Sequence, residues 1–167
     1  MMNKQEIYNA LWTLTKERYD ACKTEAVSVD KNHPTERGAL QLQAGIYHAA
    51  ITAGLLSGTD TAAALMGRRF RDLIQRFPDI ADYYRTLPED QRELMEISLY
   101  PEVFMRASFY DAYQTDLEMA EKDGDPQMIF KARIKKEVLD DILNLWRTFR
   151  VQNGLFSFAF DSREARS

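Results

Sequence analysis

Four acidic side chains in the last third of the chain have a spacing that could hold a divalent cation. Glu118 and Glu121 stand three residues apart on one predicted helix, and Glu137 and Asp140 repeat that spacing on the next. Side chains three residues apart share one face of a helix. Mg²⁺ prefers hard oxygen ligands and shares them with substrate phosphates. One alternative prediction is therefore a Mg²⁺-dependent enzyme.

This pattern, which Asp141 and Asn144 extend along the same face, resembles that of the all-α nucleotide pyrophosphohydrolases, the MazG and dimeric dUTPase group. The resemblance covers residues 118–144 and implies that the four carboxylates bind Mg²⁺ for nucleotide hydrolysis. Helix geometry opposes this interpretation. If the chain reverses at Gly124, the two pairs are offset by roughly 15 Å at 1.5 Å per residue.

Motifs that commit a chain to other chemistries are missing from the sequence. It contains no HExxH, CxxC, GxxxxGK[ST] or GxGxxG pattern. Its only histidines are His33 and His48, and Cys22 is its only cysteine, so no internal disulfide can form. We therefore assign no catalytic residue and no cofactor to the chain in the leading interpretation.

Arginines suited to binding line one face of the predicted helix 61–76. Met66 and Phe70 lie on the apolar arc of this helix, and the arginines lie on the opposite arc. Their guanidinium groups could contact an acidic protein or the phosphates of a nucleic acid, and a merely solvated face is the third alternative. The candidate partner-binding arginines are Arg68, Arg69, Arg71 and Arg76.

A run of aromatic residues follows the last predicted helix. Phe156, Phe158 and Phe160 alternate after Gly154, which ends that helix. Exposed together they would form an apolar patch of a kind that soluble monomers rarely carry. We expect residues 155–167 to form an arm that folds back over the helices, and the alternative is an arm that docks on another chain. The three phenylalanines are candidate partner-binding residues because aromatic side chains dominate interface energetics.

Composition bounds the class of protein. The chain has 167 residues, 45% of them hydrophobic, which suffices for one domain with a packed core. Its net charge of −4 argues against a dedicated nucleic-acid binder, which is normally basic. The N-terminus lacks the pattern of a signal peptide, and the longest apolar stretch, 44–56, is too short to cross a bilayer. We expect a cytoplasmic protein.

Hydrophobic periodicity predicts helices throughout, which indicates an all-α protein. Pro78, Pro88 and Pro101 should each open a helix, because proline suits the first helical position. We expect one domain, 1–154, folded as an antiparallel bundle of six or seven helices with 35–56 and 127–152 at its centre. The predicted helices span 3–26, 35–56, 61–76, 78–85, 88–100, 101–122 and 127–152.

The leading hypothesis is a non-enzymatic interaction protein: an accessory protein, adaptor, inhibitor or regulatory subunit. It would present the arginine face and the aromatic arm to a protein partner, which includes a second copy of itself. The alternatives are the Mg²⁺-dependent pyrophosphohydrolase and a small helical subunit of a nucleoprotein complex that contacts nucleic acid through its arginine face.

Overall fold

The computed structural model describes residues 2–29, 32–54 and 60–156, and within these ranges it is helical with no strand. This confirms the predicted all-α class. The helices are α1 (Lys4–Ser28), α2 (Pro34–Gly54), α3 (Asp60–Leu73) with a 3₁₀ turn (Ile74–Arg76), α4 (Pro78–Thr86), α5 (Glu89–Met105), a π-helical segment (Arg106–Tyr110), α6 (Asp111–Asp123) and α7 (Pro126–Gln152).

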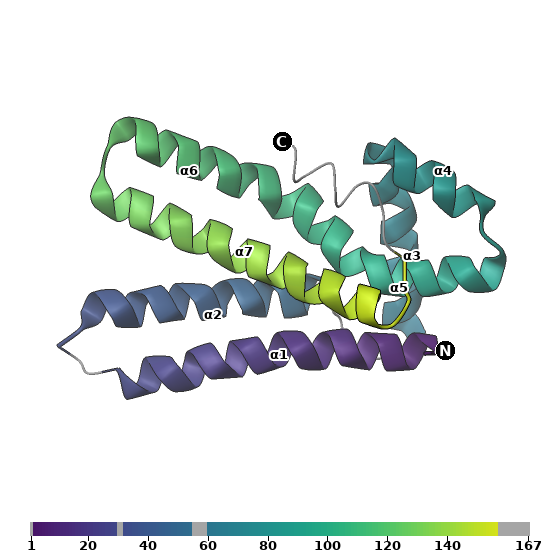
Figure 1. Cartoon of the computed structure of the whole chain (residues 1–167), viewed down its shortest axis with the longest axis horizontal. Helices are drawn as coiled ribbons and strands as arrows, with labels where there is room; N and C mark the ends of the chain where they lie inside the picture. Colours follow the sequence, from purple (N-terminus) through teal and green to yellow (C-terminus); the bar gives the residue numbers. More distant parts are fainter. Residues whose placement is uncertain (1, 30–31, 55–59, 157–167) are drawn as a thin grey trace.

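Two antiparallel hairpins make up the body of the molecule (Figure 1). Helices α1 and α2 form one hairpin, and α6 and α7 form the other. The C-terminal end of α1 and the N-terminal ends of α2 and α7 lie together at the left of the view, whereas α3 and α4 lie at the right. Because α5, the π-helical segment and α6 run on without interruption, the described residues form six continuous rods.

Local sequence signals set several helix ends as predicted. The side chain of Asn3 accepts a hydrogen bond of 2.9 Å from the backbone N–H of Glu6 at the start of α1. Gly124 has a φ of 75°, the left-handed conformation that ends helices without cost only at glycine. Asp125 then caps α7 by accepting from the N–H of Gln127 at 3.0 Å.

The predicted helix boundary at Pro101 is wrong. Helix α5 begins at Glu89 and continues through Pro101 to Met105. An interior proline removes one helical hydrogen bond and costs about 3 kcal/mol. Nearly every side chain from Met95 to Met105 is buried, so tertiary packing on both sides of the proline outweighs this local penalty. The π-helical segment follows directly.

The centre of the bundle differs in part from the prediction. Helix α7 is central, with Trp146 and Ile142 fully buried. Helix α2 packs against α1, α5 and α7 but exposes Gly45 and His48, so it is not surrounded. The second central helix is α5. Sequence reasoning missed it because Glu96 and Glu102 make the segment look like a surface helix, although both carboxylates are buried with partners.

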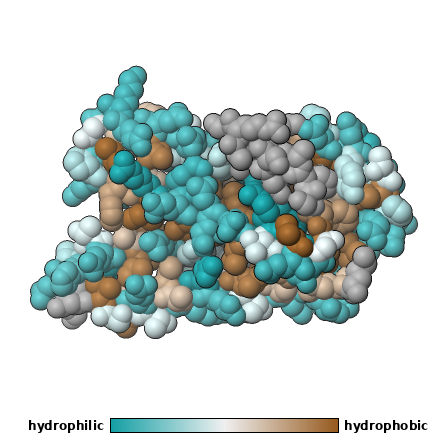
Figure 2. Space-filling view, viewed as in Figure 1, coloured by the Kyte–Doolittle hydropathy of each residue, from teal (hydrophilic) through white to brown (hydrophobic). Residues whose placement is uncertain are grey.

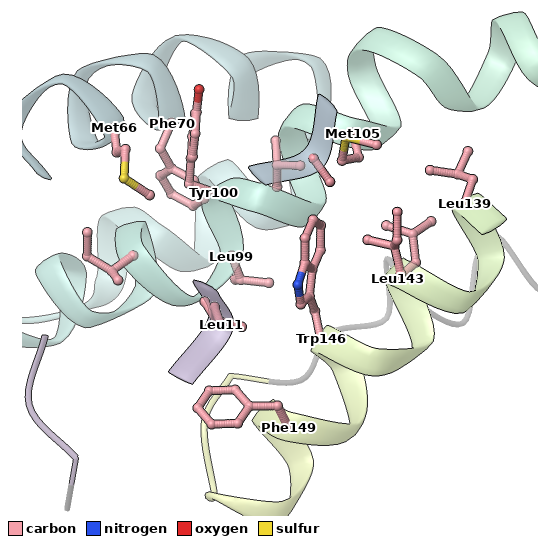
Figure 3. Close-up of a cluster of buried hydrophobic side chains, with 14 of the residues drawn as sticks. Leu11, Met66, Phe70, Leu99, Tyr100, Met105, Leu139, Leu143, Trp146 and Phe149 are labelled. Carbon is pink, nitrogen blue, oxygen red and sulfur yellow. The ribbon is translucent and has the colours of Figure 1, made fainter. Parts of the chain in front are cut away.

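The hydrophobic core joins both hairpins (Figure 3). The indole of Trp146 projects from α7 toward α1 and α5, where Leu11 and Leu99 lie close to it. Met105 and Leu143 extend the same cluster, and all five side chains are buried. Among the described residues, no helix combines the length and the apolar character needed to cross a membrane.

Candidate functional site

The four predicted magnesium ligands do not converge. Glu121 lies 3.9 Å from a guanidinium nitrogen of Arg133, and Asp140 lies 3.1 Å from Nζ of Lys136. In the part of the chain that the structure describes, no three histidine, cysteine or acidic side chains gather where a metal ion could be held. The antiparallel pairing of α6 and α7 separates the two pairs along the helices. All four side chains are exposed: Glu118, Glu121, Glu137 and Asp140.

Two of the four predicted partner-binding arginines make contacts within the fold. Arg71 on α3 donates from Nη1 to Oε1 of Glu96 on α5 at 2.8 Å. Arg76 donates from Nη1 to the carbonyl of Ala107, in the π-helical segment, at 3.3 Å. These contacts attach α3 and its 3₁₀ turn to α5 and to the π-helical segment. Arg71 and Arg76 thus have partners within the fold, and both side chains remain exposed.

The carboxylate that receives Arg71 is also bound by a tyrosine. The phenol of Tyr84 on α4 donates to Oε1 of Glu96 at 2.6 Å. Burial, followed by this hydrogen bond, raises the pKa of Tyr84 above that of a free tyrosine. Glu96 thus links α3, α4 and α5.

Arg68 and Arg69 remain available on the surface of α3. Both side chains are exposed, and within the described ranges neither is recorded in an ion pair. Arg68 borders a shallow polar pocket that also includes Lys4 and Glu93. The partner-binding role of all four arginines stays a prediction, and acidic neighbours partly balance the positive charge near Arg68.

The start of the predicted aromatic arm packs on the bundle. The backbone N–H of Leu155 donates to the carbonyl of Arg150 at 2.8 Å, and the Leu155 side chain is buried. The ring of Phe156 packs edge-on against Tyr83 of α4, with centroids 6.4 Å apart. These two residues follow the predicted fold-back. Phe158 and Phe160 lie outside the described residues, so their predicted role stays a prediction.

An apolar groove between α2 and α7 was not predicted. It has a volume of about 570 Å³, within the range of ordinary ligand-binding clefts. It lies near the start of both helices, at the left end of the molecule in Figure 1. Figure 2 shows apolar, brown surface between the two hairpins at that end. The lining residues are Pro34, Thr35, Gly38, Ala39, Leu42, Gln127, Phe130, Lys131, Ile134 and Lys135.

Large apolar side chains are exposed in and near this groove. Phe130 lines it with 44% of its surface accessible, whereas Met128 and Met119, which line a separate pocket between α6 and α7, are 55% and 59% accessible. The sequence places Phe130 on the same stripe as Ile134 and the buried residues of α7. The sequence shows that the apolar stripe of α7 extends to Phe130. It does not show that the neighbouring helices leave this end of the stripe uncovered.

The polar part of the groove is basic. Lys131 is exposed, and Lys135 lies 3.9 Å from Asp116 of α6. Among the residues that the structure describes, the lining includes these two lysines and no carboxylate. The groove therefore combines an apolar surface with positive charge at one edge, although the whole chain is acidic.

Comparisons with protein-family models, with curated proteins and with solved structures gave no match for this chain. The fold and the surface define the molecule as an all-α helical protein with an open apolar groove.

Proposed function

We propose that this chain is a non-enzymatic helical interaction protein that binds another polypeptide. The observation that carries the proposal is the groove between α2 and α7, where Phe130 remains 44% accessible beside apolar neighbours. Aromatic and methionine side chains are enriched in the cores of protein interfaces. Among the described lining residues, Phe130 is the exposed aromatic side chain, and a partner that occupies the groove would cover its ring.

The groove suits a polypeptide better than an enzyme substrate. A reaction centre needs an acid, a base or a nucleophile at the apolar surface. Within the part of the chain that the structure describes, the only ionisable side chains that line the groove are Lys131 and Lys135. Accessory protein, adaptor, inhibitor and regulatory subunit all remain compatible with this proposal, and the proposed address is the cytoplasm.

A second contact surface is the pair of exposed arginines on α3. Arg68 and Arg69 could contact an acidic partner or a phosphate backbone. Protein is the better candidate, because two arginines release few counterions from a nucleic acid and the chain has a net charge of −4.

The test compares affinity capture from a native lysate by the purified protein and by two matched variants. Gly38→Leu places a side chain in the groove, and a Cβ at this position would contact no atom within 4 Å. Gly45→Leu makes the same change about 10 Å further along the same face of α2, outside the groove lining and with equally open space. The proposal predicts a captured protein that Gly38→Leu loses and Gly45→Leu keeps. Identical captured proteins for all three chains would refute it.

A further inference from the structure

We infer that the groove accepts an amphipathic α-helix of a partner protein whose polar side carries carboxylates. This inference rests on the proposed function and specifies the chemistry of the partner. Its basis is the shape of the groove, the small residues of one wall and the charge of the other wall.

The shape of the groove suits about two helical turns. Its walls are the segments Pro34–Leu42 of α2 and Gln127–Lys135 of α7. Each segment spans about 12 Å at 1.5 Å per residue. A partner helix that lies between α2 and α7 would pack as the helices of this bundle pack on one another. Over two turns, such a helix presents the side chains at positions i, i+3, i+4 and i+7 to the groove.

The α2 wall allows a close approach. Gly38 and Ala39 carry the smallest side chains in the lining, and the space beside the Cα of Gly38 is open. Small residues let the backbones of packed helices come near one another. On the facing wall, Phe130 provides a large exposed apolar contact, and Ile134 lies below it, largely buried. A helix with leucine-sized anchors would therefore meet a flat wall on one side and a bulky wall on the other.

Charge selects among such helices. Lys131 is exposed and is recorded in no ion pair among the described residues, so its charge is available to a partner. Lys135 lies 3.9 Å from Asp116, and an exposed pair at that distance is weak. Because the described lining residues include two lysines and no carboxylate, an acidic helix meets attraction there and a basic helix meets repulsion.

The experiment uses two synthetic helical peptides of about 18 residues, each with leucines at i, i+3, i+4 and i+7 positions. One peptide carries glutamates on its polar face and the other carries lysines. Binding to the full-length protein is measured by fluorescence anisotropy. We expect the glutamate peptide to bind at least about tenfold more tightly than the lysine peptide.

The variants locate the binding site. Gly38→Leu should weaken binding of the glutamate peptide by about tenfold or more, and Gly45→Leu should leave it unchanged. Lys131→Glu should remove most of the preference for glutamate, whereas Lys122→Glu, outside the lining, should not. Circular dichroism of each variant controls for folding. Equal binding of both peptides, absence of binding, or no effect of Gly38→Leu overturns the inference.

Two outcomes separate this inference from the proposed function. In the first outcome, Gly38→Leu loses a captured protein, but the glutamate peptide binds no more tightly than the lysine peptide. The chain then binds a polypeptide in the groove, and the inference that this polypeptide is an acidic helix is overturned. If sedimentation shows a dimer of the natural chain that Gly38→Leu abolishes, the occupant is a second copy, and the inference is overturned.

Discussion

Glu102 on α5 and Arg150 on α7 form a buried ion pair across the middle of the bundle. Nη2 of Arg150 donates to Oε1 of Glu102 at 3.0 Å, and the two side chains are 1% and 0% exposed. Nε of Arg106 donates to the other oxygen of Glu102 at 3.1 Å. Arg150 also donates from Nε to the carbonyl of Phe156 at 3.1 Å. One carboxylate thus connects α5, the π-helical segment, α7 and the chain after α7.

Replacing this carboxylate should destabilise the protein strongly. Glu102→Gln keeps the size of the side chain but removes the negative charge that the buried Arg106 and Arg150 both contact. Removing one partner of a buried pair costs about 3–5 kcal/mol. Urea unfolding of this variant should show that loss, whereas Glu93→Gln at an exposed position should change the free energy of unfolding by less than about 0.5 kcal/mol. Similar losses in both variants would contradict this account.

A buried hydrogen bond between α1 and α7 predicts a smaller loss. Nε1 of Trp146 donates to Oγ1 of Thr15 at 2.9 Å, and Thr15 donates to the carbonyl of Leu11 at 2.8 Å. Thr15→Val removes the acceptor and leaves the indole N–H unsatisfied, which costs about 1–3 kcal/mol. Chemical unfolding followed by tryptophan fluorescence measures the loss. The exposed Thr115→Val is the control, and an equal effect there would argue against this hydrogen bond.

The packing of α3 against α5 predicts that two glycines respond with opposite signs. A Cβ on Gly67 would lie 2.6 Å from Oε2 of Glu96, whose carboxylate is held by Arg71 and Tyr84. Gly67→Ala should therefore lower the free energy of unfolding. Gly45→Ala meets open space and should raise it by about 0.5–1 kcal/mol, the usual gain in a helix. The denaturation midpoints of the two variants test this difference in sign. A higher free energy of unfolding in both variants would be inconsistent with a Glu96 side chain that is held in place.

The link between Tyr47 and Asp141 predicts a loss of stability at high pH. The phenol of Tyr47 donates to Oδ2 of Asp141 at 2.6 Å, and burial followed by this hydrogen bond raises the pKa of Tyr47 above its ordinary 10.0. The folded state therefore holds the phenol proton at a pH where the unfolded chain releases it. This contribution to stability is complete below pH 10 and decreases above it.

Denaturation at a series of pH values measures this effect. Above pH 10 the free energy of unfolding should fall less steeply for Tyr47→Phe than for the natural chain. Some slope should persist, because burial also raises the pKa values of Tyr84 and Tyr113. The exposed Tyr83→Phe is the control. Parallel curves for Tyr47→Phe and the natural chain would contradict the assignment.

Part of the candidate site was visible in the sequence. The apolar stripe of the last helix predicted Ile134 and Trp146 as core residues, and both are buried. Phe130 has the same spacing but remains exposed, since none of the described helices covers the start of α7 on that side. Periodicity identifies the face of a helix that is apolar, but it cannot show where a neighbouring helix ends.

The sequence by itself determined the helical class and the caps at Asn3 and Asp125, because these depend on interactions within a few residues. Only the tertiary structure decided that α5 passes through Pro101, that Arg71 is engaged with Glu96, and that a groove separates α2 from α7. These features depend on contacts between residues far apart along the chain. Such contacts can outweigh local preferences, because they bury charge and apolar surface that one helix cannot bury alone.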